Sequence, residues 1–101
     1  MIISMVEGKV PPERQDALEK AYRAQIDDGL PEGVVQTYLL RNADDVWRIV
    51  TVWRSREDFE AVRLSANGPP AIRMFRSAGV EPALQVFEVI HKASQRGLER
   101  L

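Results

Sequence analysis

The stretch that most constrains the fold is residues 46–63, where a strand with apolar residues in both alternating phases runs directly into a capped helix. The two phases are Trp47, Ile49, Thr51 and Trp53, and then Val46, Arg48, Val50 and Val52. A strand with one face in water alternates apolar with polar residues instead. Both faces of this strand are therefore expected to be covered.

The helix after this strand has a clear start signal. Ser55 can accept a hydrogen bond from a free backbone N–H as the N-cap, and Glu57 and Asp58 place carboxylates in the first turn, where they are favourable. Phe59 and Val62 set its buried face. The pattern predicts a helix that packs on the sheet at once after the strand.

The remaining elements follow from periodicity and from Gly and Pro punctuation. The predicted order is a strand over residues 2–9, a helix from Pro12 to Gly29, strands over 34–41 and 46–53, a helix from Ser55 that breaks at 67–70 and resumes to Gly79, and a strand over 83–91. Residues 93–101 have little apolar content and are expected to be a C-terminal tail or a short helix.

This order predicts an α+β, ferredoxin-like βαββαβ fold with a four-stranded antiparallel sheet in one domain over residues 1–92. The helices of such a fold lie on one face of the sheet. The second apolar face then needs another cover, and a second copy of the chain is the simplest candidate. We therefore expect a homodimer through the sheet face.

Composition excludes several classes of function. The chain has 14 Lys plus Arg, 15 Asp plus Glu and no cysteine. A net charge near zero gives no basic field for nucleic acid or an anionic membrane, and a disulfide framework is impossible. Met1 runs straight into Ile2 without a basic leader, and no apolar run is long enough to span a membrane. These features predict a cytoplasmic protein without a nucleic-acid or membrane partner.

The segment Trp-Arg-Ser-Arg-Glu-Asp-Phe-Glu-Ala at residues 53–61 resembles the strand-to-helix signature of the antibiotic biosynthesis monooxygenase family, in the dimeric α+β barrel superfamily. The resemblance extends from Ile2 to about Lys92. It implies a homodimer with an apolar pocket between sheet and helices in each subunit. It also implies cofactor-free oxidation of an aromatic phenol or hydroquinone by dioxygen.

The site residues of these monooxygenases carry over only in part. Trp53 matches the family's Trp, but Ile49 stands at its Asn position and Phe59 at its Tyr position, while Arg73 falls near its Arg position. Haem-degrading relatives resemble one another in an Asn on the first strand and a His on the second helix. Here the first strand offers Ser4 and Glu7, and the sole histidine, His91, ends the last strand.

We therefore predict Trp53 and Arg63 as catalytic residues, without a cofactor or a metal. Arg63 lies four residues after Phe59 on the apolar stripe of its helix, so it either reaches the pocket or pairs with a carboxylate such as Glu88. The predicted pocket residues are Tyr22, Trp47, Ile49, Phe59 and Arg73.

Two functions remain open from the sequence. The first is a cofactor-independent monooxygenase acting on a small or polycyclic aromatic phenol, with Arg63 stabilising the anion. The second is a non-catalytic ligand-binding or accessory homodimer, in which the two tryptophans are core residues, Arg73 is solvated and His91 is a surface residue.

Overall fold

A computed structural model of the chain describes residues 1–100. Its elements are β1 (Ile2–Lys9), α1 (Pro12–Asp28), β2 (Val34–Arg41), β3 (Val46–Trp53), α2 (Arg56–Arg63), α3 (Pro70–Ser77), β4 (Ala83–Glu88), β5 (His91–Ser94) and β6 (Gly97–Arg100). The first seven elements form the body of the molecule, which has the predicted ferredoxin-like fold.

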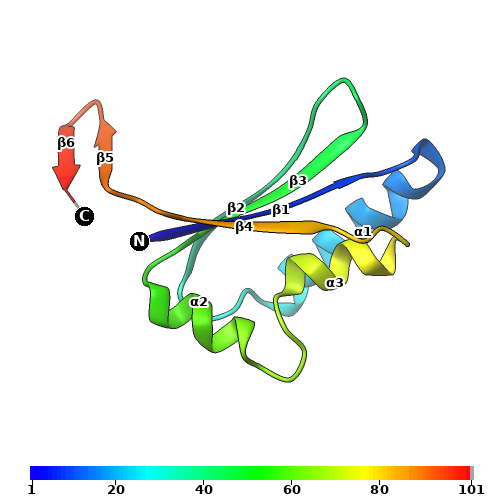
Figure 1. The fold of residues 1–101 in the computed structure, drawn as a ribbon, viewed down its shortest axis with the longest axis horizontal. Helices are drawn as coiled ribbons and strands as arrows, with labels where there is room; N and C mark the ends of the chain where they lie inside the picture. The colour runs from blue at the N-terminus through cyan, green and yellow to red at the C-terminus, as the bar shows by residue number, and fades with distance from the viewer. Residues whose placement is uncertain (101) are drawn as a thin grey trace.

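The body is one antiparallel sheet with strand order β2-β3-β1-β4 and with α1, α2 and α3 against one of its faces (Figure 1). In the central strands, Ser4 lies opposite Thr51 and Val6 opposite Ile49. This register places one alternating set of residues under the helices and the other set on the opposite face of the sheet. The predicted fold class is confirmed.

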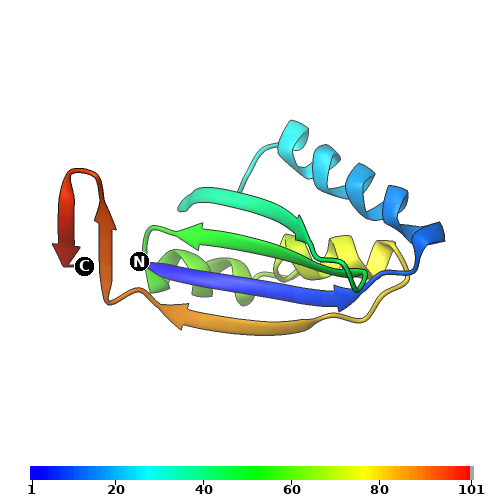
Figure 2. The same cartoon turned by 90° about the horizontal axis from the view of Figure 1, so that it is seen from above.

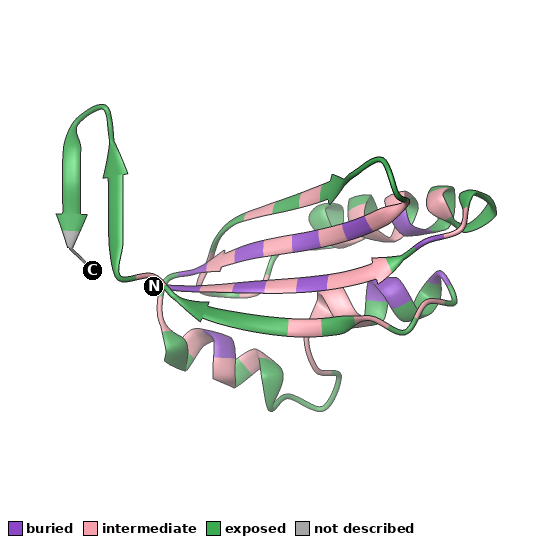
Figure 3. Ribbon diagram, turned by 45° about the horizontal axis from the view of Figure 1, so that its top comes forward, coloured by how far each residue is buried: buried purple, intermediate pink, exposed green. Residues whose placement is uncertain are grey.

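Burial alternates strictly along β3 (Figure 3). Trp47, Ile49, Thr51 and Trp53 are buried beneath the helices, and the residues between them are half-buried. The main core lies under α1 and α3, where Phe75 and Leu18 are fully buried. A smaller cluster of Ile2, Trp53 and Phe59 lies under α2.

Helix α1 crosses the sheet and supplies one wall of the space beneath it. Pro12 begins the helix, where its missing N–H costs nothing and its fixed φ suits the first turn. Gly29 ends it with φ of 112°, in a region that side chains with a Cβ rarely enter, and its N–H closes the last turn on the carbonyls of Gln25 and Ile26. Tyr22 faces the sheet from the third turn of this helix.

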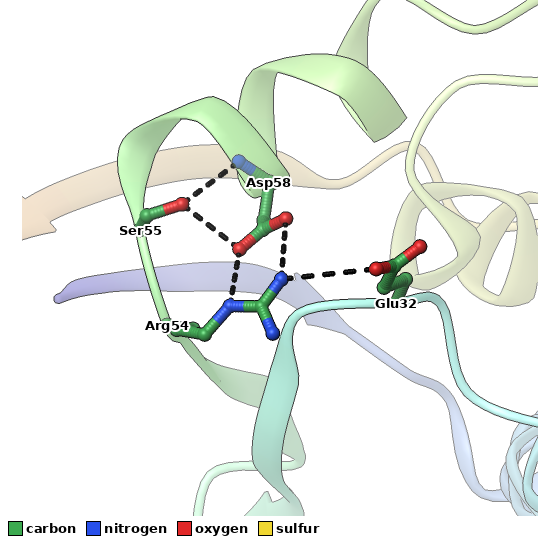
Figure 4. Close-up of polar contacts among 4 residues, drawn as sticks. All are labelled: Glu32, Arg54, Ser55 and Asp58. Carbon is green, nitrogen blue, oxygen red and sulfur yellow. Dashed lines mark hydrogen bonds and ion pairs between the residues drawn. The ribbon is translucent and has the colours of Figure 1, made fainter.

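The turn between β3 and α2 is fastened by polar groups (Figure 4). The backbone N–H of Asp58 donates to Ser55 Oγ at 3.1 Å, which makes Ser55 the predicted N-cap. Ser55 Oγ donates in turn to Asp58 Oδ2 at 2.8 Å, and Arg54 donates to both carboxylate oxygens of Asp58 at 2.9 and 3.0 Å. These hydrogen bonds, first that from Arg54 and then that from Ser55, lower the pKa of Asp58.

The same turn is tied to the loop before β2. Arg54 N–H donates to the carbonyl of Gly33 at 2.8 Å, and the Arg54 guanidinium lies 3.9 Å from Glu32. A Cβ at Gly33 would overlap Asp58, and its φ of 91° also favours glycine. Residues 54–58 belong to the segment that resembles the family signature. Their hydrogen bonds therefore hold the turn from β3 into α2 in place.

The other face of the sheet has no cover within the described residues (Figure 2). We call it the uncovered face. Its apolar positions come from all four strands and are Ile3, Met5, Tyr38, Leu40, Val46, Val50, Val52 and Phe87. Tyr38, Leu40 and Phe87 are exposed, whereas the central residues are half-buried by their neighbours in the sheet. At one end, Arg48 pairs with Glu7 at 2.6 Å.

The C-terminal segment differs from the sequence prediction. The last strand of the sheet ends at Glu88 rather than at His91, because Glu88 pairs with Ile2, the first residue of β1, and beyond it only the Val89 N–H bonds back, to the Met1 carbonyl. The following residues form a β-hairpin, β5–β6, in place of the tail or short helix that we expected. A polar run with Lys92 opposite Glu99 and Ala93 opposite Leu98 suits a two-stranded ribbon.

Candidate functional site

A cavity lies between the covered face of the sheet, the C-terminal half of α1 and the segment that joins α2 to α3. Its empty volume is about 480 Å³ with the open mouth included, and only a small part of that volume is wide enough for a water molecule. The cavity is therefore narrow and open to solvent at its mouth. It is lined by Ser4, Val6, Tyr22, Gln25, Ile26, Leu30, Pro31, Val34, Thr37, Ile49, Thr51, Trp53, Pro69, Pro70, Ala71, Met74 and Leu84.

Three hydroxyl side chains cross the floor of this cavity, one from each of three adjacent strands. Ser4 of β1 is opposite Thr51 of β3, and Thr51 is opposite Thr37 of β2. Residues that are opposite each other in an antiparallel pair share a face, so the three hydroxyls form a row. We call Ser4, Thr51 and Thr37 the hydroxyl row. Ser4 and Thr51 are only 5% and 8% exposed.

The row is connected to the aromatic residues on either side. Trp53 Nε1 donates to Ser4 Oγ at 2.9 Å, which is a short and buried bond. The Tyr22 hydroxyl donates to Thr37 Oγ1 at 3.4 Å, and the Thr37 and Thr51 hydroxyls are also 3.4 Å apart. Bonds of this length are weak, and each hydroxyl has one donor and two acceptor sites. The row therefore keeps hydrogen-bonding capacity for a guest in the cavity.

Three of the residues that the sequence analysis selected line the cavity. Trp53 is 3% exposed and lines the cavity, and its ring packs in a T-shaped arrangement with Phe59, with ring centroids 5.6 Å apart. Ile49 is part of the floor and Tyr22 part of the wall. The other four predicted residues, Trp47, Phe59, Arg63 and Arg73, are not in the lining.

Trp47 and Phe59 are core residues in this structure. Phe59 of α2 is buried against Trp53 and Ile2 and is not in the cavity lining. Trp47 is buried in the main core, with the Arg41 guanidinium 5.6 Å from its ring centroid. Its Nε1 has no hydrogen-bond partner among the described residues, in contrast to Trp53.

The two predicted arginines lie outside the cavity lining. Arg63 donates through Nε and Nη2 to Glu60 Oε2 at 2.9 and 2.7 Å on the exposed side of α2, and its pKa is raised by that bond. Its expected alternative partner, Glu88, is not the one it uses, because α2 ends at Arg63 and leaves the side chain free to turn back by one helical turn. Arg73 is exposed and donates to the carbonyls of Asn67 and Gly68.

The cavity lining holds no Lys, Arg, His, Asp or Glu. Its polar atoms are those of the hydroxyl row, Tyr22, Gln25 and Trp53. Within residues 1–100, no group of His, Cys, Asp and Glu has an arrangement that could hold a metal ion. The site can therefore enclose an apolar body and hydrogen-bond one polar edge with uncharged groups.

No helix among the described residues is long and apolar enough to cross a membrane.

Sequence reasoning missed the hydroxyl row as a unit. Thr51 and Ser4 each appear on the buried phase of a strand, and two hydroxyl residues on buried phases of neighbouring strands are a usable signal. The missing information was the register, since a shift by one residue would move either side chain to the other face.

The fold and this cavity define a small α+β protein with an uncharged pocket between one sheet and its helices. Residues 1–67 match the family described as antibiotic biosynthesis monooxygenase. The chain belongs to the antibiotic biosynthesis monooxygenase family. No curated protein sequence matches it.

Solved structures similar to this chain carry related descriptions. A putative antibiotic biosynthesis monooxygenase from Deinococcus radiodurans is 13% identical, with a TM-score of 0.69 over 88% of this chain and 92% of the other. SnoaB, a cofactor-independent oxygenase from Streptomyces nogalater, is 14% identical, with a TM-score of 0.65 over 87% and 91%. At these identities the likeness shows the fold.

A third similar structure is a variant of MhuD with two manganese protoporphyrin IX molecules bound per active site. It is 27% identical, with a TM-score of 0.66 over 93% of this chain and 99% of the other. In our chain the sole histidine, His91, is exposed on β5, and the cavity lining has no imidazole or thiolate. These residues do not fit a haem held by an axial His or Cys.

Proposed function

We propose that this chain is a cofactor-independent monooxygenase that oxidises a small aromatic phenol or hydroquinone with dioxygen in the cavity above the hydroxyl row. Family membership supports a function of the general antibiotic biosynthesis monooxygenase type. The observation that carries the proposal is a narrow, mainly apolar cavity with three uncharged hydroxyl groups in a row on its floor.

The shape of the cavity suits a flat ring. Trp53, Ile49 and Leu84 provide apolar surface below it, and Met74 closes it from α3. Methionine adapts its shape easily, so Met74 is the wall that we expect to move when a ring enters. The small free space favours a one-ring or two-ring substrate over a larger polycyclic one.

The hydroxyl row would hold the oxygen of the phenol. As electron density builds on that oxygen, hydroxyl donors fixed in a dry site stabilise it without reorganising, in the manner of an oxyanion hole. Tyr22 adds a fourth hydroxyl from above through its bond to Thr37. This role replaces the one expected for Arg63, which is engaged with Glu60 outside the cavity lining.

The reaction balances without an external reductant. In a phenol with hydrogen on its para carbon, that carbon loses its C–H bond and gains a C=O bond from one atom of dioxygen, and the hydrogens of that C–H and of the phenol O–H leave with the second oxygen atom as water. In a hydroquinone, one ring C–H becomes C–OH with one atom of dioxygen, and the hydrogens of the two original hydroxyls leave with the second oxygen atom as water. The substrate supplies all four electrons, and the protein supplies a dry and oriented site.

The proposal predicts oxygen consumption and quinone formation by purified, metal-free protein with a panel of small hydroquinones, naphthols and anthrones. Thr37→Val and Tyr22→Phe should each lower kcat by about 10²-fold, as the loss of one oxyanion donor does elsewhere. Arg63→Leu and Arg73→Leu are matched controls outside the cavity lining and should leave kcat within about two-fold of the parent protein.

A second candidate, a non-catalytic ligand-binding protein, is favoured by the small free space and by the absence of charged groups in the lining. The same panel separates the two. Binding without oxygen consumption would support the second candidate and overturn the first. If Arg63→Leu abolished turnover while Thr37→Val did not, the assignment of the hydroxyl row would be wrong.

We also propose that the chain is a homodimer through the uncovered face. Eight apolar positions across four strands form a continuous patch there, which is unusual on a monomer in water. The Glu7–Arg48 pair at one end offers a polar rim.

A further inference from the structure

Met74 of α3 brings sulfur to the wall of the cavity. The chain has three methionines and no cysteine, and among the described residues of the lining Met74 is the one that carries sulfur. Met74 is 8% exposed and belongs to the main core, whereas Met1 and Met5 are half-buried and are not in the lining. An oxidant in bulk solvent therefore reaches Met1 and Met5 more easily, and an oxidant in the cavity reaches Met74.

A thioether is the group in this lining that a hydroperoxide oxidises most readily. The other side chains of the lining are aliphatic groups, alcohols, an amide, a phenol and an indole. Thioether sulfur is soft and polarisable, and it takes up one oxygen atom in a two-electron step to become a sulfoxide. A hydroperoxide in the cavity thus meets one preferred target.

Met74 is also part of the wall between the cavity and an open groove. The groove lies between α1 and α3, which pack against each other on the covered face of the sheet (Figure 1). Gln25, Pro70 and Met74 line both the cavity and the groove. The Met74 carbonyl accepts hydrogen bonds from Ser77 Oγ at 2.7 Å and from the Ala78 N–H at 3.3 Å, which fix the backbone there. The Met74 side chain therefore decides how well this wall seals.

We propose that Met74 is an oxidation site of this protein, at which a hydroperoxide held in the cavity transfers its outer oxygen atom to the Met74 sulfur. The natural oxidant rests on the proposed function, because it is the hydroperoxide that forms when dioxygen adds to a ring carbon of the bound phenol. This hydroperoxide is enclosed by the cavity walls until it loses water to give the quinone. Oxidation of Met74 competes with that loss of water and limits the number of turnovers.

Atoms and electrons balance in this step. The phenol and dioxygen give a hydroperoxide on the para carbon, which still carries its hydrogen. The Met74 sulfur attacks the outer oxygen, the O–O bond breaks, an S=O bond forms, and the hydrogen of the outer oxygen moves to the oxygen left on the carbon. The sulfur is oxidised by two electrons, and the hydroperoxide is reduced by two electrons to an alcohol. Loss of the para hydrogen to the ring carbonyl oxygen then gives a hydroquinone in place of a quinone and water.

The sulfoxide changes the wall that Met74 now forms. A polar S=O group is unfavourable in the apolar core unless it finds a hydrogen-bond donor, so we expect it to turn toward the groove. This movement opens the wall and lets water into the cavity. Because the hydroxyl row stabilises a developing oxyanion best in a dry site, kcat falls as the sulfoxide accumulates.

The first experiment needs no turnover. The full-length protein is treated with cumene hydroperoxide, an apolar hydroperoxide with one ring, or with hydrogen peroxide, and peptide mass spectrometry quantifies each methionine sulfoxide. The ratio of Met74 to Met1 oxidation should be about ten-fold higher with cumene hydroperoxide, because the apolar oxidant enters the cavity. In urea, where the cavity is lost, the two oxidants should give the same ratio. Equal ratios in the folded protein, or a preference that persists in urea, would overturn the proposal.

The second experiment follows turnover of the best substrate from the phenol panel, with and without catalase. Met74 should be oxidised before Met1 and Met5, and catalase should not prevent it. Met74→Leu should complete about ten-fold more turnovers than the parent before it loses half of its own initial rate. The matched control Met5→Leu should lose its rate as fast as the parent. Met74→Gln, which has a polar group of similar length, should have a lower kcat than Met74→Leu. Circular dichroism verifies that each variant is folded.

The outcomes distinguish the oxidation site from the proposed function. Protection of Met74 by catalase identifies free hydrogen peroxide as the oxidant and overturns the oxidation site while the monooxygenase stands. Inactivation of Met74→Leu as fast as the parent also overturns it. If no phenol is turned over, the proposed function fails. In that case a ratio raised about ten-fold by cumene hydroperoxide still supports Met74 as the oxidation site, and an unchanged ratio overturns it.

Discussion

The two faces of the central sheet are built from the same four strands, yet they do different things. On the covered face, the apolar residues are sealed by helices, and the seal is incomplete over the hydroxyl row, where a cavity remains. On the uncovered face, a second set of apolar residues has no layer above it within the described chain. An apolar face of a sheet is thus expected to be buried, but the connectivity of the chain decides which of the two faces is buried by helices of the same chain.

The difference matters for function because the two faces bury different kinds of groups. Under the helices, the strands place Ser4, Thr51 and Thr37 side by side, where water is largely excluded. On the outside, the corresponding central positions are aliphatic, and the charges of Glu7 and Arg48 lie toward one end. One face is suited to a small guest with one polar edge, and the other to a flat protein surface.

The largest expected effect is on stability, and it compares a phenylalanine under the helices with one on the uncovered face. Phe75 is fully buried on α3 under the sheet, and Phe87 is 47% exposed on β4. Phe75→Ala should lower the free energy of unfolding by about 3–5 kcal/mol, because it empties a packed site. Phe87→Ala should cost less than about 1 kcal/mol in dilute protein. Urea denaturation measures both, and equal losses would break the distinction between the faces.

A smaller effect on stability is expected from removing the hydrogen-bond acceptor of an aromatic residue on each face. Ser4→Ala removes the acceptor of the buried Trp53 N–H and should destabilise the protein by about 1–3 kcal/mol, since no water replaces it. On the uncovered face, Gln36→Ala removes the acceptor of the exposed Tyr38 hydroxyl. Water can replace that acceptor, so the change should be within about 0.5 kcal/mol. Thermal and urea unfolding report both values.

The smallest effect concerns the turn that carries β3 from the sheet into the helical layer. The pKa of Asp58 is lowered in the folded state by its hydrogen bonds from Arg54 and Ser55. Its contribution to stability is therefore present above the unfolded pKa of about 4 and is lost as the pH falls through the folded value. Asp58→Asn should flatten the acid side of the stability profile.

Much of the body follows from local sequence. The strand bounds of β1, β2 and β3, the N-cap at Ser55 and the helix break before Pro70 agree with the patterns of apolar residues, caps and prolines. The end of β4 could not be read this way, because it depends on where β1 begins. The hairpin β5–β6 is also weakly encoded, since its short strands contain few apolar residues.

The sequence predicted some residues of the candidate site correctly and others not. Trp53, Tyr22 and Ile49 lie on predictable faces of their elements, and they line the cavity. Arg63 has the right helical phase but is the last residue of a short helix, where its side chain reaches Glu60 instead. Trp47 and Trp53 share one phase of one strand, yet only Trp53 borders the cavity.

The sequence by itself determined the periodicities, the caps and the apolar content of both strand phases, because these depend on residues within one or two turns of one another. The tertiary structure alone decided that Ser4, Thr51 and Thr37 form a row, that the helices leave a cavity above it, and that the hairpin β5–β6 stands away from the body. The physical reason is register. Residues from three strands meet only after the sheet has aligned, and no local pattern specifies which residue will stand opposite which.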